Sequence, residues 1–435
     1  LKTNLADLKP GGLLIVNEDA FTKRNLEKAG YETNPLDAEV LMNDYRLHRA
    51  SLSVMATEIG KEAGLGRREA DRCKNFIALG IAYWLFDRPM EVTEDWIRKK
   101  FAGKDEIMEA NLRALKAGYH YGETAELFDE AYTVPKQPNV TKGTYRNISG
   151  NQALALGMVA SSVQSGRDLV LGSYPITPAS DILHELSHFK HMGVRTVQCE
   201  DEIAGVCVAL GAAYGGALGL TTSSGPGIAL KAEAIGLALM VELPLIVVNV
   251  QRGGPSTGLP TKTEQSDLLQ ILYGRNGDSP LPVVSASSPG DCFYAAIEAC
   301  RIALRYNTPV VLMTDGYLAN GSEPFKIPET EDLPKLESPS YDGPAEDYLP
   351  YKRNADGARS VISAGTPGGF EHRIGGLEKA DNTGHISYDP LNHQRMTELR
   401  AAKVQSIAKD LPATHVNGER QGDLLVVGWG GTWGA

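Results

Sequence analysis

Leu245-Ile246-Val247-Val248-Asn249-Val250 is a short apolar run that predicts a β-strand. Runs of the same kind recur before and after it, with helical patterns between them: Asp168 to Leu171, Arg195 to Gln198, Leu218 to Ser223, Val283 to Ser285 and Val310 to Thr314. Strands that alternate with helices at this spacing imply parallel βαβ units. The sequence therefore predicts an α/β fold with a doubly wound parallel sheet, whose ligands bind at the carboxyl ends of the strands.

The regions around this sheet have different patterns, which divide the chain into parts. Residues 1–134 hold one predicted strand and then mostly helices, which indicates the end of a smaller α/β domain with a helical tail. Residues 135–144 contain two prolines and no periodicity, so we expect a linker. The sheet domain is expected at residues 145–325, and residues 326–422 read as a polar connector with one helix near His393 to Lys409. Residues 423–435 resemble the first strand and Gly-rich turn of a following, truncated α/β domain.

Length and composition limit the functional classes. A chain of 435 residues, of which 42% are hydrophobic, suits two or three globular domains. It has no uninterrupted apolar run long enough to predict a membrane-spanning helix. The net charge is −11, and the basic residues are interleaved with acidic ones, which argues against a nucleic-acid surface. We therefore expect neither nucleic acid nor a membrane as a partner.

The cysteines indicate the cellular compartment. Five of them are scattered along the chain without a C-x-x-C pair: Cys73, Cys199, Cys207, Cys292 and Cys300. This usage favours a reduced, cytoplasmic protein. It also fits none of the usual spacings for iron-sulfur ligands, so any such cluster is expected in another chain.

His184-Glu185-Leu186-Ser187-His188 matches H-E-x-x-H, which on a helix binds zinc through both histidines, with the glutamate as general base. A metzincin needs glycine three residues after the second histidine, and here that position is His191. The apolar residues of this segment lie on another face, so we interpret the histidines as a solvated helix surface. A zinc-dependent hydrolase through His184 and His188 is the alternative function.

Two glycine-rich loops follow predicted strands. Gly254-Pro255-Ser256-Thr257-Gly258 matches the nucleophile elbow G-x-S-x-G, but Pro260 opposes the immediate helix that an elbow needs, so we expect an irregular loop. Ser223-Ser224-Gly225-Pro226-Gly227 has only part of a dinucleotide fingerprint, because Leu230 occupies the place of the third glycine. Its backbone amides are still placed to hold an anion or a polar ring.

Glu200-Asp201-Glu202 follows the predicted strand Arg195 to Gln198 and opens a helix of small residues. One explanation is that acidic residues in a first helical turn complement the helix dipole. The other is that one carboxylate lies at the carboxyl end of the strand, in the ligand crevice. The small residues behind it would then let a flat ring pack closely.

Several long motifs occur in a fixed order: Gly150-Asn151-Gln152-Ala153, Tyr174-Pro175-Ile176-Thr177-Pro178-Ala179-Ser180, Glu200-Asp201-Glu202-Ile203-Ala204, Thr222-Ser223-Ser224-Gly225-Pro226-Gly227 and Gln251-Arg252-Gly253-Gly254-Pro255-Ser256-Thr257-Gly258-Leu259-Pro260-Thr261-Lys262. In order and spacing they resemble the α subunit of 2-oxoacid:ferredoxin oxidoreductases. Two earlier motifs resemble the end of the γ domain of these enzymes: Phe21-Thr22-Lys23-Arg24-Asn25-Leu26 and Ala117-Gly118-Tyr119-His120-Tyr121-Gly122-Glu123-Thr124. The chain is thus similar to the fused γ-α subunit of the 2-oxoglutarate type.

Members of this family decarboxylate a 2-oxoacid on thiamine diphosphate, reduce ferredoxin through an iron-sulfur cluster and release an acyl-coenzyme A. The resemblance implies that residues 145–325 bind the aminopyrimidine of thiamine diphosphate, which is shared with a β subunit. Mg²⁺ and the [4Fe-4S] cluster are expected in that β subunit. In this chain the string nearest to a metal-diphosphate signature, Asn276-Gly277-Asp278, has no Asn pair after it. The expected partners are the β subunit, ferredoxin and coenzyme A, in an αβ heterodimer or its dimer.

The resemblance also assigns roles to residues. Glu200 matches the catalytic glutamate that shares a proton with the pyrimidine ring. Glu202, two residues on, is a competing candidate for this role, but we expect it to cap the helix. Thr177 and Arg252 match substrate-side residues, since a hydroxyl orients the carbonyl of an oxoacid and a guanidinium anchors its carboxylate. The residues expected at the cofactor are Glu200, Thr177, Ser224, Gly225 and Pro226.

The resemblance leaves the substrate open. The fused arrangement favours 2-oxoglutarate, but pyruvate and branched or aromatic oxoacids use similar scaffolds. Lys262 and Arg275 are positional candidates for reading the distal part of the substrate. A further alternative is that the chain is a non-catalytic assembly subunit.

Overall fold

The computed structural model describes residues 1–124, 132–135, 137–371, 374–413, 416–419 and 421–432. The chain divides into two compact units, Leu1–Thr141 and Lys142–Ala435. The boundary between them falls inside the linker expected at residues 135–144. Among the described residues, no helix combines the length and the apolar character that crossing a membrane requires.

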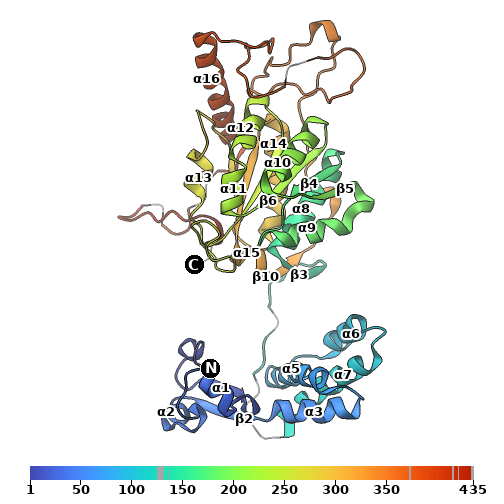
Figure 1. Cartoon of the computed structure of the whole chain (residues 1–435), viewed down its shortest axis with the longest axis vertical. Helices are drawn as coiled ribbons and strands as arrows, with labels where there is room; N and C mark the ends of the chain where they lie inside the picture. The colour runs from blue at the N-terminus through green and yellow to red at the C-terminus, as the bar shows by residue number, and fades with distance from the viewer. Residues whose placement is uncertain (125–131, 136, 372–373, 414–415, 420, 433–435) are drawn as a thin grey trace. The chain divides into compact units, whose positions relative to one another are not determined.

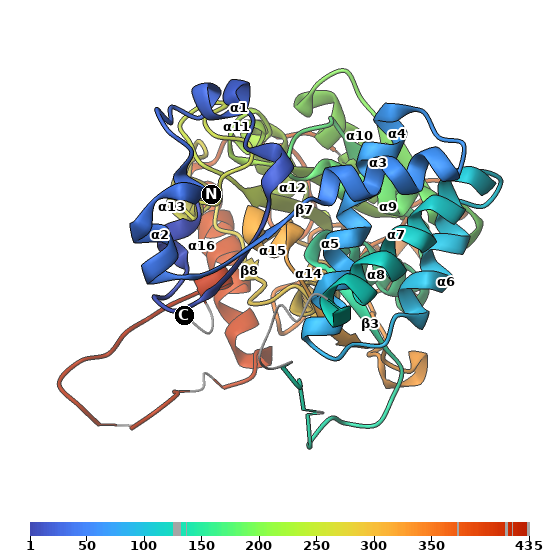
Figure 2. The ribbon, with the colours of Figure 1, turned by 90° about the horizontal axis from the view of Figure 1, so that it is seen from below.

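The first unit combines two parallel strands with a group of helices. β1 (Leu13–Asn17) pairs with β2 (Arg46–Ala50), and α1 (Lys23–Lys28) and α2 (Glu39–Asp44) lie between them in sequence. Figure 2 shows α3, α5 and α7 grouped together. The bounds of the remaining helices are α3 (Leu52–Glu62), α4 (Arg67–Arg72), α5 (Lys74–Leu85), α6 (Glu91–Lys100) and α7 (Asp105–Thr124). The sequence predicted only one strand in this unit, because Arg-Leu-His-Arg-Ala in β2 lacks apolar alternation.

Glycines allow α5 and α7 to cross closely. A Cβ added to Gly80 would lie 2.1 Å from the carbonyl oxygen of Leu115, and one added to Gly118 would lie 2.0 Å from that of Ile77. Ile77, Ile81 and their buried neighbours form the core of this unit. The helical tail predicted for the smaller domain therefore packs as an α-helical layer of its own.

The second unit is built around six parallel strands. Their order across the sheet is β5 (Val194–Gln198), β4 (Leu169–Ser173), β6 (Leu218–Ser223), β7 (Leu245–Gln251), β9 (Val310–Asp315) and β8 (Val283–Ser285). Every pairing between them is parallel. All six strands occur where the sequence predicted them, and the doubly wound parallel sheet is confirmed.

β7 lies at the centre of this sheet and is buried on both faces. Ile246, Val248 and Val250 belong to one core, together with residues of α8 (Gly150–Ser165) and α14 (Asp291–Tyr306). Leu245 and Val247 belong to the other core, together with residues of α10 (Glu202–Tyr214) and α12 (Ala232–Val241). Helices thus cover both faces, as all-parallel sheets require (Figure 1).

Shorter elements complete the unit. Four short helices are α9 (Ser180–Leu186), α11 (Gly225–Leu230), α13 (Leu268–Tyr273) and α15 (Gly316–Asn320). β3 (Tyr145–Ser149) and β10 (Ser322–Lys326) form a separate antiparallel pair. The sequence did not predict this pair, because its strands are mixed in polarity and their partners are far apart along the chain.

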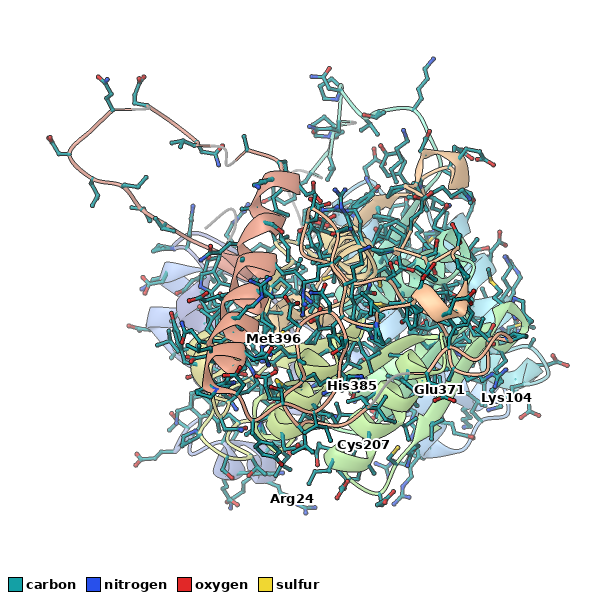
Figure 3. The ribbon with its side chains drawn as sticks, turned by 90° about the horizontal axis from the view of Figure 1, so that it is seen from above. Arg24, Lys104, Cys207, Glu371, His385 and Met396 are labelled. Atoms are coloured by element: carbon teal, nitrogen blue, oxygen red, sulfur yellow. The ribbon has the colours of Figure 1, made fainter. Side chains whose placement is uncertain are left out.

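The connector predicted at residues 326–422 is largely irregular and holds α16 (Pro390–Ser406), close to the expected helix. Met396 of α16 is buried (Figure 3). A buried ion cluster also fastens the connector, since Glu242, just after α12, accepts hydrogen bonds from Arg353 and Lys403. Buried charges therefore hold this polar segment together with apolar side chains such as Leu336 and Ile407.

The strand predicted after residue 423 is not formed in the structure. Leu424, Leu425, Val426 and Val427 have no strand assignment, and their side chains are 73–83% exposed. A strand needs a neighbour to satisfy its backbone hydrogen bonds, and no described residues pair with this segment. Residues 433–435 of the expected turn lie outside the described part of the chain.

Candidate active site

The strand order places a crevice at the carboxyl ends of β4 and β6. The chain runs from β4 outward to β5 and then returns across β4 to β6, so the direction of winding changes between β4 and β6. Doubly wound sheets bind ligands at such a switch point. The Ser173 hydroxyl donates to the Thr222 carbonyl over 3.0 Å and fastens the two strand ends to each other. A ligand site is therefore expected among the residues that follow these strands.

The acidic segment after β5 contains the solvent-exposed carboxylate of Glu200 and the buried side chain of Glu202. Glu200 is exposed. Asp201 caps α10, since its carboxylate accepts a hydrogen bond of 2.7 Å from the backbone N–H of Ala204. Glu202 is only 9% exposed and lies beside β6: a Cβ added to Gly227 would come within 2.8 Å of Glu202 Cγ and 2.0 Å of Ser223 Oγ.

These positions bear on two expectations from the sequence, the catalytic role of Glu200 and the capping role of Glu202. The chain passes from strand to helix at Asp201, so Glu200 stays outside while Glu202 packs against β6. The structure thus brings Glu202, rather than Glu200, to the switch point. The capping role expected of Glu202 belongs to Asp201. Three adjacent acids look alike in a sequence, and only the local backbone separates them.

Two buried hydroxyls follow at the end of β6 and in the turn after it, and the first of them, that of Ser223, lies next to Glu202. Ser223 ends β6 and Ser224 precedes α11, and the Oγ atoms of both are buried without a hydrogen-bond partner among the described residues. Each such group costs about 1–3 kcal/mol when it stays unsatisfied. Two of them on consecutive residues indicate that a ligand supplies the missing polar atoms. Gly225 and Pro226, also expected at the cofactor, follow directly as the first residues of α11.

The structure also brings Thr177 and Arg252 together. Arg252 is 6% exposed, and its guanidinium donates to the carbonyl of Thr177 over 2.6 Å and to that of Thr257 over 3.0 Å. Its Nε is buried and lacks a partner among the described residues. Burial lowers the pKa of Arg252. The guanidinium thus holds two loops in place and keeps N–H groups for a further acceptor, while Thr177 is exposed.

Two cavities open beside these residues. The larger, of about 750 Å³, is lined by α11 residues, by Arg252 and by the loop that ends at Asp267. Its volume is in the usual range for small-molecule sites. The smaller, of about 310 Å³, is lined by Thr177 and Pro178. Thr177 and Arg252 are therefore joined by a hydrogen bond but line different cavities.

The sequence did not predict a polar pair of which one member, Asp267, lines the larger cavity. Asp267 accepts a hydrogen bond of 3.0 Å from the side-chain amide of Asn249, and a Cβ added to Gly225 would lie 2.8 Å from Asp267 Oδ2. Burial raises the pKa of Asp267, although the Asn249 amide opposes this. The sequence could have indicated this pair through Asn249, which is a polar residue inside an otherwise apolar strand.

The H-E-x-x-H segment does not form a regular helix through both histidines. α9 ends at Leu186, and the 3-10 turn after it is interrupted at Phe189, where φ is −102° and ψ is 23°. Glu185, the general base of a zinc hydrolase, accepts a hydrogen bond of 3.0 Å from Gln152. Among the described residues, no group of three or more His, Cys, Asp and Glu side chains could hold a metal ion.

The glycine-rich loop after β7 does not form a nucleophile elbow. No helix follows Gly254–Gly258 directly, since the next one, α13, begins at Leu268. This agrees with the expected loop and not with a nucleophile elbow. All five cysteines are free, and Cys292 and Cys300 are buried in α14.

Two family models match the chain. The model described as "Pyruvate flavodoxin/ferredoxin oxidoreductase, thiamine diP-bdg" matches residues 163–387, just over half of the chain. The chain belongs to this family. The model "Pyruvate ferredoxin/flavodoxin oxidoreductase" matches residues 1–121. The family resemblance inferred from the motifs is confirmed. The first match also contains all the residues described above at the switch point.

Named relatives of the family agree with this. The chain is 53% identical over 436 residues to "2-oxoglutarate oxidoreductase subunit KorA" of Mycobacterium tuberculosis, covering 100% of this chain and 66% of that protein. It is 33% identical to "2-oxoacid:ferredoxin oxidoreductase 1, subunit alpha" of Aeropyrum pernix, covering 85% of this chain and 58% of that protein. The chain therefore spans less than two-thirds of the length of these relatives.

A solved structure is also similar to this family member. It is the "2-oxoglutarate:ferredoxin oxidoreductase from Magnetococcus marinus with 2-oxoglutarate, coenzyme A and succinyl-CoA bound". The TM-score is 0.80 at 31% sequence identity, and the match covers 96% of this chain and 68% of that chain. The similarity supports the α/β fold over nearly the whole length of this chain.

Proposed function

We propose that this chain is the subunit of a 2-oxoacid:ferredoxin oxidoreductase that holds the aminopyrimidine ring of thiamine diphosphate. The observation that carries the proposal is the buried side chain of Glu202 beside the unpartnered hydroxyl of Ser223, with a second unpartnered hydroxyl on the next residue, Ser224. These groups suit a flat ring that has both donors and acceptors of hydrogen bonds. Gly227 has no side chain, and this lets the Glu202 and Ser223 side chains approach the start of α11 closely.

In this proposal Glu202 takes the role that the motif comparison gave to Glu200. Thiamine diphosphate supplies a thiazolium carbon that acts as a nucleophile once the imino form of its pyrimidine removes the proton. The Glu202 carboxyl group would share a proton with a pyrimidine ring nitrogen and so favour that imino form. A hydrogen bond to a charged group contributes about 1.5–3 kcal/mol.

The rest of the proposed reaction involves further molecules. We propose that the complex decarboxylates 2-oxoglutarate with coenzyme A and gives an acyl-coenzyme A, CO₂ and reduced ferredoxin. The names of the similar proteins support this substrate. The proposal places Mg²⁺ and the [4Fe-4S] cluster in a β subunit, with ferredoxin and coenzyme A as the other partners of a cytoplasmic αβ heterodimer or its dimer.

Thr177 and Arg252 are proposed to face the oxoacid. The buried Arg252 guanidinium has donors left for a carboxylate after holding the Thr177 and Thr257 carbonyls. Arg275 is less suited to read a distal carboxylate, because its guanidinium is already bound to Ile271 and to Ser279. Lys262 is exposed and stays a positional candidate.

No observation favours the other two functions. The zinc hydrolase would need both histidines on one regular helix, and α9 ends between them. An assembly subunit would have no use for a buried carboxylate beside unpartnered hydroxyls, each of which destabilises the fold when no ligand is bound.

Reconstitution tests the proposal. The chain and a β subunit, titrated together with thiamine diphosphate, should reduce a viologen dye when 2-oxoglutarate and coenzyme A are present. Either chain alone should be inactive. Pyruvate and a branched oxoacid, assayed in parallel, test the substrate. Full activity of the β subunit without this chain would contradict the proposal.

Replacing Arg252 with Lys should raise the apparent KM for the oxoacid about tenfold or more. A lysine has one nitrogen and cannot hold both loops and a carboxylate, and the loss of a good charged contact corresponds to about 1.4 kcal/mol or more. The thiamine diphosphate affinity should change far less.

Arg275→Lys is the matched control for this prediction. Arg275 also binds backbone carbonyl groups, but it does not line the larger cavity. It should affect stability and leave KM within about twofold. Equal KM values for wild type and Arg252→Lys would show that Arg252 does not bind the carboxylate of the oxoacid.

A further inference from the structure

A buried lysine lies behind the candidate active site. Lys231 joins α11 to α12 and is 0% exposed. The function proposed above gives it no role. In the sequence, Lys231 is a charged residue directly after the small and apolar run Gly225–Leu230, a position at which its burial could have been suspected. An ammonium is strongly hydrated in water, so its complete burial requires a compensating role or contact.

The described hydrogen bonds of Lys231 go to two neutral oxygens. Its Nζ donates to the backbone carbonyl of Glu202 over 3.0 Å and to the hydroxyl of Thr221 over 2.9 Å. Thr221 is a fully buried residue of β6, two residues before Ser223. Burial is the largest influence on Lys231 and lowers its pKa to about 8.

These two contacts connect the parts of the candidate site. Glu202 is the first residue of α10, and Thr221 belongs to the strand that ends at Ser223. One ammonium therefore fastens the start of the helix to the end of the strand. The distance between the Glu202 side chain and the Ser223 hydroxyl depends on this link.

We propose that Lys231 is a positioning residue, which holds Glu202 at the carboxyl end of β6 through the Glu202 backbone. The inference rests on the proposed role of Glu202 and deepens it. A neutral side chain of similar length would fill the same space but would lose both hydrogen bonds. Glu202 would then move relative to the ring it serves, and displacements of about 1 Å can lower catalysis about 100-fold.

The charged form of Lys231 makes the stronger donor, so the link depends on pH. The titratable groups that act on the ammonium are Glu202, Cys199, Asp201 and Cys207, all in the segment from the end of β5 into α10. Cys207 lies on the exposed side of α10 (Figure 3). Thr221 from β6 is neutral, and Glu233 from α12 is exposed. Because the folded pKa lies near 8, the link should weaken as the pH rises through that value.

The test uses the assembled αβ holoenzyme with Lys231→Met. The proposal predicts that kcat falls about 10- to 100-fold, while KM for the oxoacid and thiamine diphosphate affinity change less than about threefold. A second readout is independent of turnover: the exchange of the thiazolium C2 proton of bound thiamine diphosphate for deuterium should slow by a similar factor.

Lys379→Met is the matched control. Lys379 is 2% exposed, and its Nζ donates to the backbone carbonyls of Gly375 and Leu377. Its loss should lower the melting temperature and leave C2 proton exchange unchanged. Equal effects of the two variants on exchange would overturn the positioning role, as would wild-type kcat in assembled Lys231→Met.

Thr221→Val keeps the lysine and removes one of its two hydrogen-bond acceptors. This variant tests the positioning role of Lys231 if Lys231→Met does not assemble. The Thr221 hydroxyl stabilises the charged ammonium, so its loss should move the alkaline limb of kcat to lower pH. An unmoved limb overturns the inference. Glu202→Gln, assayed in parallel, separates the two proposals. If Glu202→Gln is active, the proposed role of Glu202 is wrong. If Glu202→Gln is inactive and Lys231→Met is active, only the positioning role of Lys231 is wrong.

Discussion

Glu202→Gln should lower the kcat of the reconstituted complex by about 10²- to 10⁴-fold, the usual contribution of a group that transfers a proton in the rate-limiting chemistry. Glutamine has nearly the same shape as glutamate but cannot share its proton with a pyrimidine nitrogen. Because Glu202 is buried beside β6, a water molecule cannot easily reach this position and take over the role of the carboxyl group. Dye reduction at saturating 2-oxoglutarate, coenzyme A and thiamine diphosphate measures the loss, and C2 proton exchange should slow with it.

Glu200→Gln is the control for this prediction. Glu200 is two residues away and exposed, so its substitution should change kcat by less than about threefold. Both variants should assemble with the β subunit as the wild type does. The opposite ranking, with Glu200→Gln inactive and Glu202→Gln active, would restore the assignment made from the motif.

Glu242→Gln should destabilise the chain by about 3–5 kcal/mol, because it leaves buried cations without their counter-charge. Glu242 is 1% exposed and forms ion pairs with Arg353 and with Lys403, whose nitrogen lies 2.7 Å away. Burial alone would raise the pKa of Glu242, but the Lys403 and Arg353 charges outweigh it and lower that pKa to about 2. Urea unfolding of wild type and variant at pH 7 measures the difference.

The sign of this shift predicts a pH dependence. A carboxyl group whose pKa falls on folding stabilises the fold above its unfolded pKa, which is near 4.5, and loses that contribution as the pH falls towards 2. The difference between wild type and Glu242→Gln should therefore be largest at neutral pH and shrink between about pH 4.5 and pH 2.

Arg195→Gln provides the comparison for the buried cluster. Its ion pair with Asp168 lies in the same unit, but both side chains are more than half exposed. Such pairs contribute about 0–1 kcal/mol. If Glu242→Gln unfolds at the same urea concentration as Arg195→Gln, the ion cluster does not hold the connector.

The centre of the sheet was predictable because β6, β7 and β9 are buried along their whole length and need apolar sequence. Leu245–Val250 is such a strand, and the structure extends it by one residue to Gln251. β2 and β3 were not predictable in this way. Their sequences are polar, and pairing with a distant partner, rather than local preference, makes them strands.

The site was predictable to the level of segments. The motifs led to the ends of β4, β5, β6 and β7, and the structure brings Thr177 and Arg252 into contact. The choice among Glu200, Asp201 and Glu202 needed the backbone angles at one helix start. Lys231 was missed although it directly follows an apolar run, because such a position alone does not show that a lysine is buried.

The antiparallel pair of β3 and β10 has a consequence for how the protein can be engineered. Tyr145 lies opposite Lys326, so the two ends of the sheet domain meet side by side. A segment whose ends are adjacent can be moved into a loop of another protein without stretching either chain. The stretch 145–326 is thus a portable module only if Glu242 is also replaced, because its buried ion-pair partners Arg353 and Lys403 lie beyond Lys326.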